Sequence, residues 1–170
     1  MTKIGLLSDT HSYLDPKIFE HFKNVDEIWH AGDIGTIELA DELEKFKPLK
    51  AVFGNIDGHE LLARYPEVML FKVEEVKVMM MHIGGFPPKY NATSKKIIEQ
   101  HKPHLFISGH SHILKVIPDN KLNLLHINPG ACGKHGWHKV NTLIRFDVDG
   151  NRIKNLEVIE IGLRGSFTSS

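Results

Sequence analysis

The sequence predicts an α/β fold in which two mixed β-sheets pack together as a sandwich flanked by helices. Three observations predict it. In the first half, short apolar runs alternate with helical patterns, which is typical of strand–helix–strand units and a parallel sheet. In the second half, strand-like segments follow one another across short turns, which indicates antiparallel strands. The 170 residues, of which 41% are hydrophobic, have an ordinary globular composition and a length typical of one domain.

The first half of the chain contains three predicted strands and two predicted helices. The first helix follows Asp15, which can cap it, and the second shows apolar residues at helical spacing. In chain order these elements are a strand over 4–7, a helix over 16–22, a strand over 27–30, a helix over 37–46 and a strand over 49–53.

The second half is predicted to add strands around one more helix. Strands over 68–73 and 76–82 could form a hairpin, and Asp149-Gly150 is a typical hairpin turn. Asn91 caps the helix that follows it. The remaining predicted strands cover 105–108, 115–118, 122–127, 142–148 and 152–161. Since no repeat or linker interrupts the pattern, we expect a single domain over 1–161, followed by a C-terminal tail over 162–170.

Composition excludes several classes of protein. Lysine plus arginine and aspartate plus glutamate number 21 each, so no basic platform for nucleic acid is predicted. The single cysteine, Cys132, excludes an internal disulfide framework. No apolar run approaches the roughly 18 residues of a membrane span, and no signal-peptide pattern opens the sequence. We therefore expect a soluble cytoplasmic protein without a membrane partner.

Twelve histidines are the unusual feature of the composition, and several of them follow predicted strands directly. In open α/β sheets, the turns after the carboxyl ends of strands form the crevice in which ligands bind. Five such turns carry two carboxylates, one amide and four imidazoles, namely Asp9, His11, Asp33, Asn55, His82, His110 and His112. A nitrogen and oxygen set without thiolate suits Mn, Fe, Zn or Ni.

Each of these residues also has a simpler interpretation when it is taken alone. Asp33 could cap the helix near Thr36, and His82 could be a hydrogen-bonded core residue. Together, however, buried carboxylates and imidazoles without a cation would be costly, which favours a metal site. Two divalent ions held by two carboxylates would leave the site electropositive. It would then attract a phosphate although the protein is neutral overall.

The motifs themselves resemble a known family. Five blocks occur in the order found in the calcineurin-like metallophosphoesterases: Asp9-x-His11, Gly32-Asp33, Gly54-Asn55-x-Asp57, His82 and Gly109-His110-x-His112. Asn128-Pro129-Gly130 further resembles the small bacterial and archaeal phosphodiesterase branch, so the resemblance covers nearly everything up to residue 161.

The resemblance implies a binuclear metal-dependent phosphoesterase that acts on small phosphate esters, more on diesters than on monoesters. Asp9, His11, Asp33 and His112 would hold one ion, and Asp33 would bridge to a second ion held with Asn55, His82 and His110. A hydroxide shared by the ions would be the nucleophile. Asp33 and Asn55 would thus take part in catalysis, with Asn55 contacting the substrate. Mn²⁺ is the first expectation for both ions, with Fe, Zn or Ni as alternatives.

One departure from the family pattern concerns the general acid. Ile56 stands where the family usually has the histidine that assists the leaving oxygen. His59 is the first candidate to replace it, and His135 and His138 are alternatives. Without an acid, esters with an alkoxide leaving group should react slowly, and aryl or 2′,3′-cyclic esters should react faster.

Other residues are expected to support the site. Asp57 would orient Asn55 or a water, and His30 would either support a ligand or simply pack. Gly130 and Ala131 would offer backbone contacts to the substrate or form only a tight turn.

The function has rival interpretations. The same fold serves as a protein-binding scaffold in the eukaryotic retromer complex, where the metal site is impaired, whereas this chain keeps all seven candidate ligands. A phosphomonoesterase is the second alternative. A homodimer formed through exposed strand edges is left open.

Overall fold

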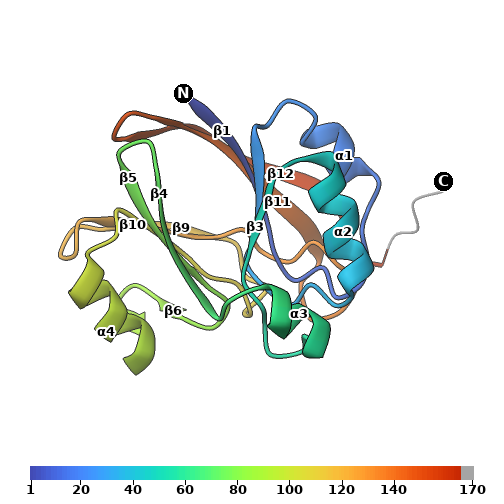
Figure 1. The fold of residues 1–170 in the computed structure, drawn as a ribbon, viewed down its shortest axis with the longest axis horizontal. Coiled ribbons are helices and arrows are strands. Elements are labelled where there is room, and N and C mark those ends of the chain that lie inside the picture. The colour runs from blue at the N-terminus through green and yellow to red at the C-terminus, as the bar shows by residue number, and fades with distance from the viewer. Residues whose placement is uncertain (166–170) are drawn as a thin grey trace.

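The fold was determined as a computed structural model, which describes residues 1–165, and consists of two five-stranded sheets packed face to face (Figure 1). The first sheet has the order β12-β11-β1-β2-β3. Its parallel part comprises β1 (Thr2–Leu7), β2 (Glu27–His30) and β3 (Leu49–Ala51). The hairpin of β11 (Val140–Asp149) and β12 (Arg152–Leu163) adds to β1 in antiparallel register.

The second sheet has the order β4-β5-β8-β10-β9 and is also mixed. The three central strands β5 (Val76–Met81), β8 (Leu105–Ile107) and β10 (Leu124–Asn128) are parallel. The two edge strands β4 (Val68–Val73) and β9 (Lys115–Asp119) pair with them in antiparallel register. The predicted sandwich of two mixed sheets is therefore confirmed.

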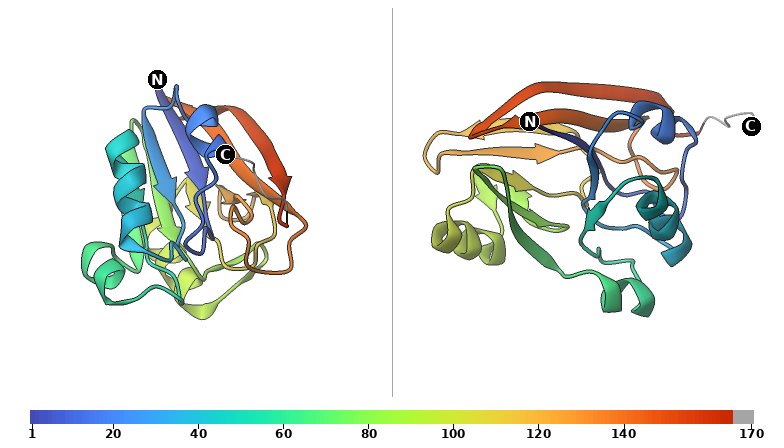
Figure 2. Two further views of the ribbon diagram at one scale, coloured as in Figure 1. Left: turned by 90° about the vertical axis from the view of Figure 1, so that its right-hand side faces the viewer. Right: turned by 45° about the horizontal axis from the view of Figure 1, so that its top comes forward.

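Helices cover both outer faces of the sandwich (Figure 2). Helices α1 (Lys17–His21), α2 (Ile37–Phe46) and α3 (His59–Arg64) lie on the first sheet. Helix α4 (Ala92–His101) lies on the second sheet. Within the described residues, no helix is long and apolar enough to cross a membrane.

Local chemistry explains where the helices begin. The Thr36 hydroxyl accepts a hydrogen bond from Leu39 N–H, and Asn91 caps α4 as predicted, through Ser94 N–H. The Asp15 carboxylate accepts from Lys17 N–H at the start of α1.

Three apolar clusters correspond to the three contacts between layers. The central cluster joins the sheets, with Ile4 and Leu6 of β1 facing Val78 and Met80 of β5. Leu7 belongs to the cluster under α1 and α2, which shows the alternation expected of a strand covered on both faces. This packing fixes the two sheets relative to each other, and with them the ends of their parallel strands.

Two parts of the chain differ from the sequence prediction. The short helix α3 and the two-stranded ribbon of β6 (Gly85–Phe86) and β7 (Lys89–Tyr90) were not predicted, because both are too short to show a hydrophobic period. Strand β12 continues through Leu163, two residues into the predicted tail, and Arg164 N–H then donates to Lys139 O. The rest of that tail, 166–170, lies outside the described residues.

Candidate metal centre

The turns that follow four parallel strands bring six of the predicted ligands into two groups. Asp9, His11 and His112 form one group, and Asp33, His82 and His110 form the other. Within each group the atoms that could bind a metal ion lie within 4.8 Å of one another. Residues far apart in the sequence therefore meet because β1, β2, β5 and β8 end at one edge of the sandwich.

Asp9 is completely buried and presents one carboxylate oxygen to the site. Its Oδ2 accepts hydrogen bonds from the Ser8 hydroxyl at 2.7 Å and from His110 N–H at 3.1 Å. Its Oδ1 lies 3.2 Å from His112 Nε2 and 3.7 Å from His11 Nε2. The carboxylate is thus held from behind, while the free oxygen faces the imidazoles.

Asp33 lies between the two groups. Its Oδ2 is 3.1 Å from His82 Nε2 and 3.3 Å from His11 Nε2, and these two histidines belong to different groups. Its Oδ1 accepts a hydrogen bond from Ile56 N–H at 3.1 Å. This placement is the one that a carboxylate bridging two ions needs.

The buried polar atoms in this cluster fit a metal. Asp9 Oδ1, His11 Nε2 and His82 Nε2 are buried and have no hydrogen-bond partner among the described residues. His82 Nδ1–H donates to Ala31 O at 2.7 Å, which leaves the lone pair of Nε2 directed at Asp33. A histidine that donates one ring nitrogen to a carbonyl and offers the other is typical of metal ligands. Buried atoms without partners are costly, and divalent cations would satisfy them.

The imidazoles and the carboxylates shift each other's pKa values. Burial raises the pKa of Asp9, but the neighbouring His11 and His112 outweigh it and hold that pKa well below its usual range. Burial likewise opposes ionisation of Asp33, yet His82 lowers the pKa of this carboxyl group. The two carboxylates in turn raise the pKa of His82 against the effect of burial. Both acids are therefore ionised near neutral pH, as ligands must be.

Asn55 joins the second group. Its Oδ1 lies 3.0 Å from His110 Nδ1, at the open edge of the cluster. Asn55 thus lies beside the second group, and its role as a ligand or a substrate contact stays a prediction.

The backbone at these turns is unusual. Asp9, His11, Asp33, His110 and His112 all have positive φ, between 45° and 71°. Residues other than glycine rarely adopt this conformation, and each costs about 1–3 kcal/mol unless the surroundings impose it. Such backbone concentrates at functional sites because it aims side chains that ordinary turns would direct elsewhere.

Two residues without a place in either group hold the turns together. The Asp57 carboxylate accepts from the N–H groups of Gly54, Ile34 and Gly35, so it joins the turn after β3 to the turn after β2. The sequence predicted that Asp57 would orient Asn55 or a water. In the structure its hydrogen bonds go to backbone N–H groups of the two turns.

His30 holds the turns after β1 and β2 in a similar way. Its Nδ1 accepts from Gly32 N–H, and its Nε2–H donates to the Thr10 hydroxyl, which in turn donates to Ile34 O. Burial lowers the pKa of His30 to about 3, so the ring stays neutral. Of the two predicted roles, these contacts favour support of the ligand turns.

Glycine is required where the turns approach each other most closely. A Cβ on Gly54 would overlap the Asp33 carboxylate, and a Cβ on Gly32 would overlap the His82 ring. Gly32 also has a φ of 101°, which glycine alone adopts without strain. The glycines of the motifs thus leave space for the candidate ligands.

The three candidate general acids differ in their distance from the cluster. The ring of His135 lies 4.8 Å from that of His11, and the ring of His138 lies 5.1 Å from that of His112. His138 Nε2–H donates to Gly133 O and Asn141 Oδ1. The side chain of His135 is exposed.

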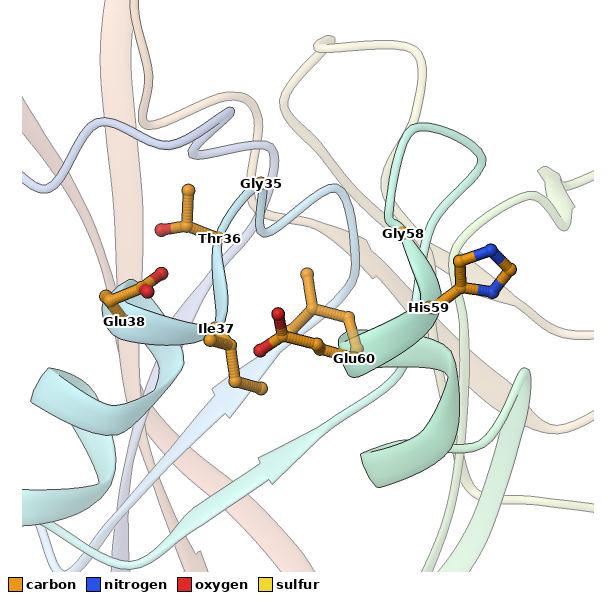
Figure 3. Close-up of a pocket in the computed structure, with 8 residues that line it drawn as sticks. Gly35, Thr36, Ile37, Glu38, Gly58, His59 and Glu60 are labelled. Atoms are coloured by element: carbon orange, nitrogen blue, oxygen red, sulfur yellow. The ribbon is translucent and has the colours of Figure 1, made fainter.

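His59 has no such contact with the cluster. It begins α3 beside a pocket of about 330 Å³ that none of the seven candidate ligands lines, and its ring points away from Thr36 and Ile37 (Figure 3). Among residues 1–165, no hydrogen bond or ion pair joins it to the seven. The geometry favours His135 over His59.

The Asn-Pro-Gly turn supports a ligand turn. Asn128 Nδ2–H donates to the backbone carbonyl of Gly109 and to the side-chain hydroxyl of Ser111, so it contacts the residues on either side of His110. Sequence reasoning missed this role of Asn128. Gly130 and Ala131 are buried, and their described backbone contacts are with Asn128 and Thr142. Their burial favours a structural turn over the substrate contact that was the other expectation.

Cys132 is buried as well, and burial raises the pKa of its thiol. A raised pKa makes it a poor nucleophile.

Comparison with known proteins supports the family resemblance. A "probable metallophosphoesterase" of Methanothermobacter thermautotrophicus is 30% identical over 94% of this chain and 92% of its own length. Phosphodiesterase MJ0936 of Methanocaldococcus jannaschii is 25% identical over 76% of this chain and 84% of its own length. Vps29 of Chaetomium thermophilum superposes with a TM-score of 0.76 at 15% identity, over 95% of this chain and 97% of that one, and this likeness shows the fold alone.

The family model itself covers most of the chain. The model described as the calcineurin-like phosphoesterase superfamily domain matches residues 2–151, which include every motif from Asp9 to Asn128. With the sandwich fold and the two candidate metal-binding groups at its edge, this match shows that the chain belongs to the calcineurin-like phosphoesterase superfamily.

Proposed function

We propose that this protein is a binuclear metal-dependent phosphodiesterase. The observation that carries the proposal is the position of Asp33, whose Oδ2 lies within 3.3 Å of one histidine from each candidate group. A carboxylate shared in this way is what two adjacent divalent ions require. We assign Asp9, His11, Asp33 and His112 to one ion, and Asp33, Asn55, His82 and His110 to the other, with Mn²⁺ as the first expectation.

When bound, the two ions would polarise the phosphoryl oxygens and lower the pKa of water to supply the nucleophile. The chain itself supplies position and charge. Ser8 and His110 N–H fix the Asp9 carboxylate, and Ile56 N–H fixes that of Asp33. Because these groups are held before the substrate arrives, little reorganisation is needed during the reaction.

Asp9 and Asp33 carry two negative charges against the four positive charges of two divalent ions, so a net positive charge remains that suits a phosphate ester of either kind. The preference for diesters rests on two arguments. A relative of this chain at 25% identity is a phosphodiesterase. The second charge of a monoester would call for arginines, and no arginine is among the described contacts of the seven candidate ligands.

Asn55 stands at the open edge of the cluster, where its Nδ2–H group can donate to a substrate oxygen while Oδ1 faces His110. Ile56 follows it and is 45% exposed, so no proton donor occupies the position of the usual histidine. His135, beside His11, is the histidine that we propose as its replacement.

The proposal is tested with the purified protein loaded with Mn²⁺. Hydrolysis of bis-p-nitrophenyl phosphate is compared with that of p-nitrophenyl phosphate, and bound metal is measured independently. We expect the diester to react faster and Asp33→Asn to reduce its turnover at least 100-fold, because the bridging charge is lost. Asp41→Asn, a matched change on the surface of α2, should keep wild-type turnover. A protein that binds two ions but hydrolyses neither ester would contradict the proposal and favour the scaffold alternative.

A further inference from the structure

A second pocket, of about 260 Å³, opens directly beside the candidate metal centre. We call it the side pocket, and its lining includes Ile83, Phe86, Lys89, His110, Lys115 and His126. His110 belongs to one of the candidate metal-binding groups, so a phosphorus atom bound at the centre would lie next to this pocket. The pocket is smaller than the roughly 300–1,000 Å³ typical of sites for drug-sized ligands, so it suits a single ring.

Hydrogen bonds hold the wall of the side pocket in place. The segment that follows His82 is tied down at two carbonyl groups, since Ser94 donates to Gly84 O and Ser108 donates to Gly85 O. The opposite wall is the turn at Gly109, held by Asn128 Nδ2–H. The pocket is therefore formed before a ligand binds.

His126 is a buried polar residue that lines the pocket, and one of its two ring nitrogens has no hydrogen-bond partner among the described residues. The residue is 0% exposed, and its Nδ1–H donates to Phe106 O at 3.1 Å. Nδ1 therefore carries the hydrogen, which makes Nε2 an acceptor. Nε2 is buried and has no hydrogen-bond partner among the described residues. Burial lowers the pKa of His126 to about 4, so the ring remains a neutral acceptor at pH 7.

The remaining lining combines the apolar side chains of Ile83 and Phe86 with polar residues and two lysines, Lys89 and Lys115. Ile83 is 44% exposed, and Phe86 packs its ring under the Lys115 ammonium at 3.1 Å from the ring centroid. This contact fixes the Phe86 ring. An apolar, rigid wall next to an anion-binding centre fits the organic part of a phosphate ester.

We propose that the side pocket binds the organic group of the ester, and that this group is a single planar ring carrying an N–H or O–H donor for His126 Nε2. The ring would pack between Ile83 and Phe86 while the phosphate lies at the metal centre. This inference rests on the proposed function, and it names the substrate class that the site selects.

The test uses three diesters that share a p-nitrophenolate leaving group. Their second substituent is methyl, phenyl or 3-hydroxyphenyl, and kcat/KM is measured for each with the Mn²⁺-loaded protein. We expect phenyl to exceed methyl about tenfold or more, mainly through KM, and 3-hydroxyphenyl to exceed phenyl several-fold. Equal values for methyl and phenyl would overturn the proposal.

Variants then locate the effect. Phe86→Ala should lower the phenyl-to-methyl ratio about tenfold, and His126→Leu should bring the ratio of 3-hydroxyphenyl to phenyl close to one. Phe19→Ala, which removes a ring from α1, is the matched control and should keep both ratios. If Phe86→Ala also keeps them, the ring binds elsewhere. Phe86 is only partly buried, so we expect Phe86→Ala to fold. The measurement on Phe86→Ala therefore tests the proposal even if His126→Leu does not fold.

A binding measurement separates this inference from the proposed function. If none of the diesters is hydrolysed, the activity fails, but phenyl phosphate can still be titrated into the Mn²⁺-loaded protein by calorimetry. The Kd should rise about tenfold in Phe86→Ala and stay the same in Phe19→Ala. An unchanged Kd in Phe86→Ala would overturn the proposal that the side pocket binds the organic group, even if the metal centre binds the phosphate.

Discussion

Two buried carboxylates determine what the site can do. Asp9 and Asp33 are ionised because imidazoles and backbone N–H groups surround them, and each leaves one oxygen directed at histidine nitrogens. At this scale the sequence prediction was good, since six of the seven residues chosen for their type form the two groups and Asn55 lies beside His110.

His135 is the residue that we propose as the general acid. We expect His135→Gln to reduce kcat for an alkyl diester by 10- to 100-fold, because an alkoxide needs a proton to leave. The same variant should hardly change the rate for bis-p-nitrophenyl phosphate, whose leaving group needs no proton. Steady-state rates on the two esters check this. A loss in His59→Gln with none in His135→Gln would return the assignment to His59.

At the scale of elements, the turns after the strands carry the candidate metal ligands. Sequence patterns placed the strands of the parallel sheets to within about two residues, which put the motifs at strand ends. They did not show how one turn supports another. The Asp57 carboxylate joins two turns that are more than twenty residues apart, and such contacts depend on register that no local pattern reports.

Asp57 gives the prediction at this scale. Asp57→Ala should lower the free energy of unfolding by about 2–4 kcal/mol, because three N–H groups lose a charged acceptor. Metal affinity should fall 10- to 100-fold, since both turns carry candidate ligands. Urea denaturation and calorimetric Mn²⁺ titration measure the two effects. Asp41→Ala serves as the control, and a loss of affinity there as well would show that the effect is not specific to the turns.

For the whole molecule, metal binding should be coupled to stability. The cluster contains ligands from turns of both sheets, so ions bound there would stabilise the packing of one sheet against the other. At 100 times the Kd, Mn²⁺ should add about 2.7 kcal/mol, which corresponds to a rise in Tm of roughly 5–10 °C. Thermal unfolding with Mn²⁺ and with chelator measures this rise. The rise should largely disappear in Asp33→Asn, and an equal rise there would place the ions elsewhere.

Two buried histidines predict how stability depends on pH. The folded-state pKa values of His30 and His126, about 3 and about 4, lie below the ordinary value of 6.5. Between pH 4 and 6.5 these two histidines therefore bind protons in the unfolded chain but not in the folded protein, so their contribution to stability is full above pH 6.5 and falls as the pH drops. The slope is at most about 2.7 kcal/mol per pH unit for the two groups.

Urea denaturation of the metal-free protein at several pH values measures this slope. His126→Leu should reduce it by about half, because one of the two groups no longer titrates. A variant with the full slope would mean that His126 is not held neutral in the folded protein.

A homodimer stays a prediction. The edge strands β12 and β9 each expose apolar side chains, among them Val158 and Val116. Sedimentation equilibrium would detect a doubled mass. The cytoplasmic location likewise stays a prediction.

The sequence by itself determined the fold class, the family and the ligand types, because hydrophobic period and short motifs are local properties of the chain. The tertiary structure alone decided which histidine lies beside the cluster, how Asp57 and Asn128 hold the turns, and that an acceptor on His126 is buried with no hydrogen-bond partner in the described part of the chain. These features depend on which turns meet when two sheets pack, and that is a property of the whole sandwich rather than of any segment.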